Sequence, residues 1–526
     1  MSEVKEPLAV EITKEESNVH HKHFKYDREE RKKRYQGGVK LKDALMIFCA
    51  GFALVSDGYQ NNVMSMLNKV FALMYPKEYT SGMSTQVSNA SLVGTIFGQV
   101  AIGVCCDYIG RKFSIVLGSC FLIFGSMMCA ASHGKTVNGM FWMLTIFRGV
   151  TGFGIGAEYP SSSTSASEAA NHSVRRRGGA FVLATNLPLS FGGPFALIIF
   201  LIVNKITKSS LDALFRTMFA IGCFWPLSVL YFRLKLVTSE LYTKSAIKHK
   251  VPYWLAFKFY WMRLLGVCLA WFLYDFVTFP NGIFSAGMQR LLALIKIVLK
   301  CSIVTKAKST PQDTLENVAE WNLLLGAIAL PGVFVGAYLI DIIGRKYTMM
   351  IGFSGYIVFG LIVGCAYEQL SKITALFIVF YGLMQSCGNL GPGNVLGTAS
   401  SESFATPVRG TGYGIAAAIG KVGGTAVVGT KVFTPIQNNL GKRWTFIIAA
   451  ICGLAGVIVT FLFVPHLRDD DLLEEDVRFK NYLIDNGWTG KFGIKSYDEE
   501  EDLDYSEDSG SDIKENFKIE ENEKVH

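Results

Sequence analysis

Twelve apolar stretches of roughly 20 residues divide the chain, and this pattern limits the possible fold more than any other feature. Because 50% of the residues are hydrophobic and only 18% are charged, a soluble globular fold is excluded. A run of about 20 apolar residues is long enough to cross a bilayer as a helix. We therefore predict an all-α membrane protein with twelve transmembrane helices, at roughly 43–66, 86–106, 112–132, 139–162, 179–203, 214–234, 264–288, 321–341, 346–366, 373–397, 410–436 and 443–465.

Basic residues predict the orientation of these helices. Residues 25–42 contain eight lysines and arginines, which the positive-inside rule places in the cytoplasm. Alternate loops carry further basic residues, so both termini are predicted to be cytoplasmic. The basic loop 290–319 breaks the rule. Its apolar run favours either an amphipathic helix on the lipid surface or a segment that gathers anions outside.

Two motifs recur at the same offset. The sequence Asp107-Tyr-Ile-Gly-Arg-Lys returns 234 residues later at Asp341, and Glu168 returns as Glu402 with the same separation. Two matches at one offset indicate two homologous six-helix halves. The predicted domains are an N-terminal tail, a first half, a linker, a second half and an acidic tail, at 1–42, 43–234, 235–263, 264–465 and 466–526.

The repeated motif lies at a cytoplasmic turn in each predicted half. Glycine permits the sharp turn, and the arginine that follows can reach a carboxylate at a neighbouring helix end. Such ion pairs would hold the inner face closed and break when the halves rock. We therefore expect six residues to act as gates and not as substrate ligands: Asp107, Arg111, Glu168, Asp341, Arg345 and Glu402.

Charged and amide side chains also lie inside predicted spans, where they are costly and therefore indicate function. The stretch from Arg148 to Gly178 carries Glu158 beside Tyr159, and its glycines at helical spacing suit close helix packing. Its G-F-G-I-G-A run follows no strand, so we reject a dinucleotide site. The remaining intramembrane groups are Asp57, Asn389 and Lys421, together with Trp271, Asp275 and Phe279, which are four residues apart and share one helix face.

One lysine and three carboxylates cannot all stay charged in a low-dielectric cavity without strong repulsion among the acids. Proton uptake relieves that repulsion. We therefore predict a proton-coupled anion carrier in which Lys421 attracts the anion while Asp57, Glu158 or Asp275 binds protons. A co-transported proton cancels the roughly 2.3 kcal/mol per 100 mV that opposes entry of a monoanion. The alternative is a structural ion pair between Asp275 and Lys421 that locks the halves together.

Four longer motifs carry a family resemblance: G-A-E-Y-P at 156–160, W-F-L-Y-D-F-V-T-F-P-N-G at 271–282, G-N-L-G-P-G-N at 388–394 and G-K-V-G-G at 420–424. Together with the superfamily-wide D-x-x-G-R-K motif, they make the chain resemble the major facilitator superfamily, specifically its phosphate:proton symporter branch. The chain is most similar to the fungal glycerophosphoinositol permeases within that branch, over essentially the whole membrane region.

The resemblance implies which residues surround the substrate. This set is Glu158, Tyr159, Trp271, Asp275, Phe279, Asn389 and Lys421. Asp57 falls where the family carries a proton-linked aspartate, and Asn186 is the nearest counterpart of a family glutamine. The sequence departs from the family at Glu158, where the family has aspartate, and at Phe279, where it has tyrosine. Because the missing hydroxyl removes a phosphate donor, the departure favours a phosphodiester over bare phosphate.

The resemblance thus implies a plasma-membrane importer of glycerophosphodiesters, namely glycerophosphoinositol and glycerophosphocholine. It is expected to act as a monomer by alternating access, to use the proton gradient and to need no cofactor or metal. An inorganic phosphate:proton symporter and a non-transporting phosphate-ester sensor are the alternatives. We expect neither an enzyme nor a nucleic-acid-binding protein, because HExxH, GxSxG and paired-cysteine metal motifs are missing from the sequence.

The last segment has the opposite composition. Residues 466–526 hold twenty acidic against eight basic residues, so we predict a solvated and largely disordered cytoplasmic tail. Ser496 and Ser509 are each followed by an acid three residues later and are predicted phosphorylation sites.

Overall fold

The computed structural model describes residues 51–52, 54–173, 177–207, 210–235, 240–247, 251–301, 311–424, 435–436, 439–465, 472–488 and 490. Every regular element within these ranges is a helix. Nine helices in the described part are long and apolar enough to cross a membrane. The other three predicted spans fall on α3, on α15 with the segments that follow it, and on α17. The all-helical membrane fold is therefore confirmed.

Among the described residues, the predicted first half contains six long helices. They are α3 (Leu54–Met74), α4 (Ser81–Tyr108), α5 (Arg111–Ala130), α6 (Val137–Ser173), α7 (Arg177–Ile206) and α8 (Leu211–Leu234). Helix α6 has 37 residues and is therefore about 55 Å long at 1.5 Å per residue. It extends eleven residues past the predicted end at 162, because its serine-rich end stays helical while it packs against neighbouring helices.

The second half is less regular. It contains α10 (Tyr253–Cys301), α11 (Pro311–Ala329), α12 (Pro331–Ile342), α13 (Arg345–Cys365), α14 (Tyr367–Leu370), α15 (Thr374–Gly388), the π-helix η1 (Asn389–Gly393), α16 (Asn394–Glu402), the 3-10 turn η2 (Thr406–Val408), α17 (Arg409–Gly424) and α19 (Arg443–Phe463).

Two predicted spans of the second half are broken. Pro331 begins α12, where its missing N–H does not matter, and so separates α12 from α11. The π-helix η1 holds Pro392, and it interrupts the predicted span 373–397 between α15 and α16. Such irregular backbone at membrane depth is tolerated where protein surrounds it. It is a common feature of transporter binding sites.

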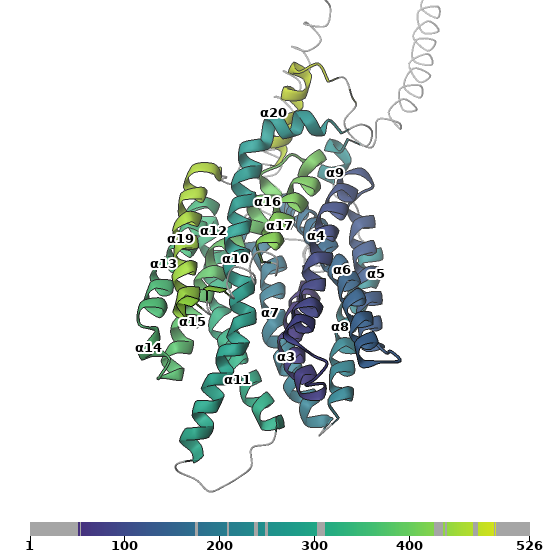
Figure 1. The fold of residues 1–526 in the computed structure, drawn as a ribbon. Helices are drawn as coiled ribbons and strands as arrows, with labels where there is room; N and C mark the ends of the chain where they lie inside the picture. The colour runs from purple at the N-terminus through teal and green to yellow at the C-terminus, as the bar shows by residue number, and fades with distance from the viewer. Residues whose placement is uncertain are drawn as a thin grey trace, which may run out of the picture.

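The two halves lie side by side in Figure 1, with α7, α10 and α17 near the middle. Helix α4 packs against α17, and α7 packs against α11 and α12, so both contacts cross between the halves. At the first contact a Cβ added to Gly414 would lie 2.3 Å from the backbone oxygen of Gln99. Only glycine therefore permits this approach.

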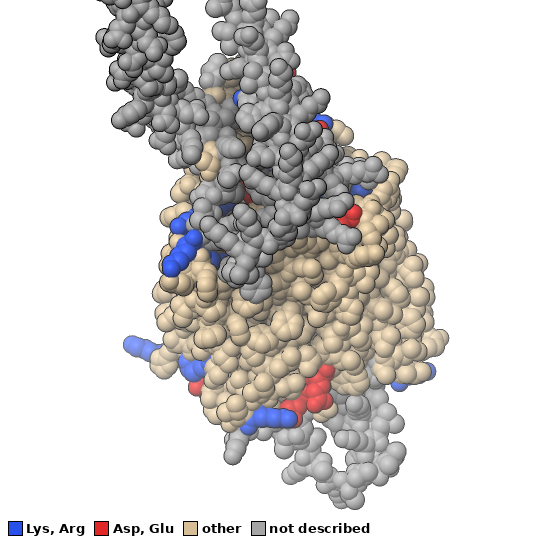
Figure 2. Space-filling view, turned by 180° about the vertical axis from the view of Figure 1, so that it is seen from behind, with Lys and Arg blue, Asp and Glu red and all other residues tan. Residues whose placement is uncertain are grey.

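The surface agrees with a membrane location. Figure 2 shows a broad band without lysine, arginine, aspartate or glutamate, bounded by charged side chains at its two ends. Phe97, Trp142 and Ile146 are 65%, 51% and 59% exposed. In water such side chains would be an aggregation hazard, whereas in a bilayer they face the lipid tails.

Part of the acidic tail is helical. Residues Leu472–Asp485 form helix α20, which lies near α9 (Glu240–Ser245) and the first turns of α10 in Figure 1. Phe479 and Leu483 pack with Tyr260 and Phe404. The sequence around them is acidic overall but apolar along one helix face, and burial of that face against the transporter stabilises the helix. Ser496 and Ser509 lie outside the described residues.

Candidate transport site and cytoplasmic gate

A buried ion pair joins α10 to α17. The Nζ atom of Lys421 lies 2.9 Å from Oδ2 of Asp275, and both side chains are almost fully buried. Both helices belong to the second half, so this pair does not bridge the halves. The alternative in which Asp275 and Lys421 lock the two halves together is therefore wrong.

Aromatic rings from both halves surround the lysine. Its Nζ atom lies 5.3 Å from the ring centroid of Tyr159 on α6 and 5.5 Å from that of Trp271 on α10. Trp271 is held in place because its Nε1 donates to Ser400 Oγ at 2.8 Å. Since Tyr159 belongs to the first half, the surroundings of Lys421 span both halves. Rings at this range attract a cation without neutralising its charge.

Glu158 does not share the ion pair of Lys421 and Asp275. Its carboxylate accepts two hydrogen bonds from Arg233 of α8, at 2.6 Å and 3.0 Å, and both side chains are fully buried. Arg233, in the last turn of α8, therefore turns its side chain inward. Sequence reasoning missed this partner, because no spacing links residues that are 75 positions apart.

Asp57 on α3 is also fully buried, and neither carboxylate oxygen has a hydrogen-bond partner in the described structure. It interacts electrostatically with Glu158, Arg233 and Lys421, so it belongs to the same buried group of charges. A buried carboxylate without a donor is costly when ionised.

Three amide side chains form contacts near the interface between the halves or within the second half. Asn389 donates to the backbone oxygen of Ala329 at 3.0 Å. Asn394, the second asparagine of the same motif, accepts a hydrogen bond from Asn186 of α7, and so links the two halves. The backbone of Phe279 lies in α10, and its side chain is outside the described part of the chain.

A surface hollow of about 680 Å³ lies between α4, α5 and α6. Phe97 and Ile146, two of its lining residues, are exposed. The residues that line it are uncharged, so it does not suit an anion, and it is separate from the surroundings of Lys421.

At the end of the bundle that carries the repeated motif, Glu168 binds one arginine from each half. Its Oε1 atom lies 3.1 Å from Nη2 of Arg111 in the first half and 3.0 Å from Nη1 of Arg409 in the second. All three side chains are buried. The predicted pair of Arg111 and Glu168 is therefore present, and Arg409 extends it across the interface between the halves.

Glu402 repeats this arrangement with the halves exchanged. It lies 2.9 Å from Arg345 of its own half and 2.7 Å from Arg177 of the first half. The sequence repeat thus becomes a structural pseudo-symmetry, in which each glutamate holds an arginine of its own half and one of the other half.

The two aspartates of the motif bind helix N-termini of the opposite half. Asp107 accepts hydrogen bonds from the backbone N–H groups of Gly410 and Thr411, at 2.9 Å and 2.7 Å, at the start of α17. Asp341 accepts one from Gly179 near the start of α7, at 3.0 Å. A carboxylate is favourable at a helix N-terminus. These contacts exist only while these ends of the two halves are together, so the structure is closed at this end.

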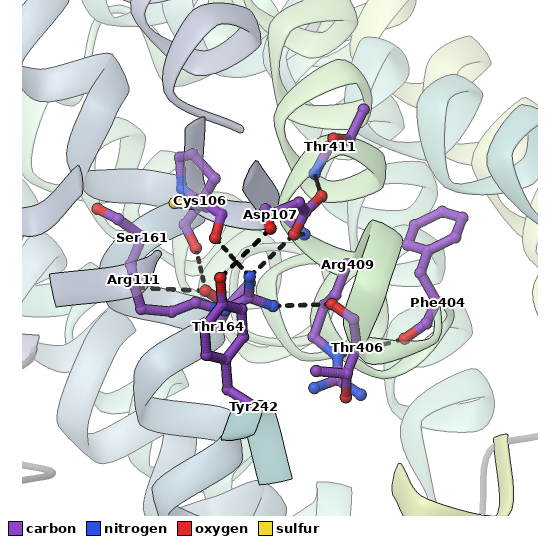
Figure 3. Close-up of polar contacts among 12 residues, drawn as sticks. Cys106, Asp107, Arg111, Ser161, Thr164, Tyr242, Phe404, Thr406, Arg409 and Thr411 are labelled. Atoms are coloured by element: carbon purple, nitrogen blue, oxygen red, sulfur yellow. Dashed lines mark hydrogen bonds and ion pairs between the residues drawn. The ribbon is translucent and has the colours of Figure 1, made fainter. Parts of the chain in front are cut away.

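Two segments outside the helical halves complete this closure, as Figure 3 shows in part. The ring of Tyr242 on α9 covers Arg111, whose Cζ lies 4.3 Å from the ring centroid, and Arg111 donates to the Thr406 oxygen at 2.9 Å. Asp476 of α20 accepts hydrogen bonds from Thr406 N and Oγ1, at 2.6 Å and 2.7 Å. Burial raises the pKa of Asp476, while Arg409 and Thr406 act in the opposite direction. Neither segment was expected to contribute to the gate.

Comparison with known proteins decides the family. Residues 44–251 and 301–479 match the family described as sugar (and other) transporter. The chain belongs to this family. The transporter is 76% identical to glycerophosphoinositol permease 1 of Candida albicans, over 93% of this chain and 92% of that protein. It is 57% identical to glycerophosphoinositol transporter 1 of Saccharomyces cerevisiae, over 92% and 91%.

More distant relatives and solved structures agree with the fold. A glycerophosphocholine permease of Candida albicans is 34% identical, over 90% of the transporter and 89% of that protein. A structure of the proton:xylose symporter XylE, of the major facilitator superfamily, superposes with a TM-score of 0.64 at 17% identity, over 83% of the transporter and 99% of that chain. The predicted superfamily and the prediction of a transporter, not an enzyme, are confirmed.

Proposed function

We propose that this protein is a proton-coupled importer of glycerophosphodiesters, chiefly glycerophosphoinositol and also glycerophosphocholine, in the plasma membrane with both termini in the cytoplasm. The observation that carries the proposal is the buried Lys421, which faces an aromatic ring from each half. The close relatives named as glycerophosphoinositol carriers support the same substrate class. One chain supplies both halves of the site, so a monomer suffices, and the proton gradient is the only other requirement.

The phosphodiester and Asp275 compete for the same cation. A phosphodiester carries one negative charge, and it can approach Lys421 closely only if the 2.9 Å contact with Asp275 loosens. The displaced carboxylate would then be buried without a partner, which is costly. Proton binding to Asp275 removes that cost. One anion and one proton therefore enter together, and the net charge of the site is unchanged.

The surroundings suit an anion that carries a polyol. Tyr159 and Trp271 present flat faces next to Lys421, on which the C–H face of a ring such as inositol can stack. The hydrogen-bonded pair Asn186 and Asn394 lies between the halves and offers amide groups to hydroxyls. Asp57, which has no hydrogen-bond partner among the described residues, is the second acid proposed to exchange a proton.

Alternating access then requires the gate to open. Glu168 and Glu402 must each release the arginine of the opposite half, while their own arginines stay bound. The two glutamates therefore remain compensated within their own halves during the movement. Opening therefore avoids the large cost of leaving a buried charge unpaired.

Uptake into liposomes that contain the purified protein tests the proposal. Glycerophosphoinositol, glycerophosphocholine, glycerol-3-phosphate and inorganic phosphate should each be measured with and without a pH gradient. We expect accumulation of the two diesters that a protonophore abolishes. Preferential accumulation of inorganic phosphate would instead support the phosphate symporter, and binding without flux of any of the four would support the sensor.

A further inference from the structure

Glu158 differs from Asp57 and Asp275, the other two acids of the buried charges described above, in how completely it is bonded. Arg233 donates to both of its carboxylate oxygens, at 2.6 Å and 3.0 Å. Ser119 on α5 lies 3.4 Å from Oε1, and Arg233 also donates to Ser119 and to Ser162, at 2.6 Å and 3.3 Å. Acid and base thus form one hydrogen-bonded unit among α5, α6 and α8, entirely within the first half.

The other two acids are bonded less. Asp57 has no hydrogen-bond partner in the described structure, and Asp275 has the bond to Lys421 for which the substrate is proposed to compete. Three carboxylates and two cations therefore make up the buried group. When all five side chains are ionised, the set carries one excess negative charge. One proton, on an acid that lacks a fixed partner, balances it.

We propose that Arg233 is a positioning residue that keeps Glu158 ionised and outside the proton cycle, so that only Asp57 and Asp275 exchange protons. This inference rests on the proposed function. Protonation of Glu158 would break a two-point contact and remove the carboxylate charge that the buried guanidinium of Arg233 binds directly. Proton binding at Asp57 leaves no cation behind.

The electrostatic surroundings support this division of roles. The charged groups that act on Asp57 of α3 are Glu158 of α6, Arg233 of α8 and Lys421 of α17. From α5, the contact with Glu158 comes from the neutral hydroxyl of Ser119. Because the ionised pair of Glu158 and Arg233 is neutral overall, a proton can bind at Asp57 without disturbing that pair.

The position of Arg233 makes the arrangement possible. It lies in the last turn of α8, where a cation is favourable, yet its side chain is fully buried. Its long side chain reaches inward to α6 instead of outward to water. An arginine is suited to this task because its planar guanidinium binds a carboxylate at two points and stays charged.

The test compares four variants, Arg233→Gln, Glu158→Gln, the double variant and Arg233→Lys, in liposomes normalised for inserted protein. Two readouts are needed: substrate counterflow without a gradient, from about pH 5 to about pH 8, and accumulation driven by a pH gradient. Arg233→Gln leaves Glu158 unpaired, and an unpaired buried carboxylate takes up a proton at higher pH, so the counterflow optimum should move at least about one unit towards alkaline pH. Arg233→Lys keeps the charge and should keep the wild-type profile.

The double variant decides the question. With both members of the pair neutral, it should regain the wild-type pH profile and still accumulate substrate, even at a lower rate. Counterflow without pH-driven accumulation in the double variant would show that Glu158 itself carries the proton and overturn the inference. An unchanged pH profile in Arg233→Gln would overturn it as well. If Arg233→Gln does not insert, the double variant and Arg233→Lys still decide. Absence of pH-driven accumulation in the wild type would instead reject the proposed function.

Discussion

The Nζ atom of Lys421 lies 2.9 Å from Oδ2 of Asp275, on two helices of the same half, while Tyr159 faces the lysine from the other half. The ion pair can therefore move as a unit when the halves rock, and only its aromatic surroundings change. An ion pair across the interface would have resisted that motion. Competition by the substrate, not movement of the halves, is what separates the two charges in the proposed cycle.

Replacement of Asp275 by asparagine should abolish pH-driven accumulation but preserve counterflow. Asparagine keeps the shape of the side chain and cannot release a proton, so the coupling step is lost while substrate exchange continues. The two activities are measured on the same liposomes. Asp212→Asn, which changes a half-exposed acid paired with Arg216, is the matched control. Concentrative uptake by Asp275→Asn would exclude Asp275 as the coupling group.

Removal of the Lys421 ammonium should weaken substrate binding. A hydrogen bond to a charged group contributes about 1.5–3 kcal/mol, so Lys421→Ala should raise the apparent KM roughly 10- to 100-fold. Lys421→Arg retains the charge and should be affected less. Saturation curves for glycerophosphoinositol uptake measure both. A wild-type KM in Lys421→Ala would place the anion elsewhere, and Arg148 would be the next residue to change.

Loss of Arg177 should favour opening of the cytoplasmic side. Arg177→Ala removes the contact of Glu402 that crosses between the halves, whereas Arg345→Ala removes the one within a half. In Arg177→Ala, a buried hydrogen bond between charged groups, worth about 1.5–3 kcal/mol, is lost from the closed state but not from the open state. A cysteine at buried Ser163 should therefore react faster with a cytoplasmic maleimide in Arg177→Ala than in Arg345→Ala. Equal rates would argue against a gating role for this contact.

A single methyl group should also disturb the closed state. In Gly414→Ala the new Cβ would lie 2.3 Å from the backbone oxygen of Gln99, so α4 and α17 must separate. We expect faster cytoplasmic labelling at the same cysteine and slower transport. Gly82→Ala is the control, because its new Cβ would meet nothing closer than 3.8 Å. Normal transport by Gly414→Ala would show that this close approach is unimportant.

Docking of α20 should depend on pH. Because burial raises the pKa of Asp476, the docked state binds a proton more tightly than the undocked state does, and acidification therefore favours docking. The free-energy cost of burying the charged Asp476 carboxylate is present at pH values above the raised pKa. This cost disappears as the pH falls through that pKa. A cysteine at buried Leu483 should become less reactive towards acid pH, and Asp476→Asn should remove that dependence. At each pH, the labelling rate of Leu483→Cys is divided by that of Leu483→Cys with Asp476→Asn. This ratio corrects for the intrinsic reactivity of the thiol.

Local patterns in the sequence predicted much of the fold of this protein. The lengths of the apolar stretches predicted the membrane helices, and the repeat at Asp107 and Asp341 predicted two halves whose turns require glycine. Gly110 and Gly344 indeed have φ angles of 131° and 86°, which favour glycine. These features depend on neighbours in the chain, on helix periodicity and on the cost of placing charge in lipid, so they can be read without tertiary structure.

The partners of the buried charges were decided by tertiary structure alone. The sequence shows that Glu158, Asp275 and Lys421 lie in membrane helices, but it does not say that Arg233 takes the first acid and Lys421 the second. Nor does it show that Asp476 of the tail reaches Thr406. Which acid meets which base depends on how helices far apart in the chain rotate and pack, and helical periodicity leaves that rotation undetermined until all the helices are assembled.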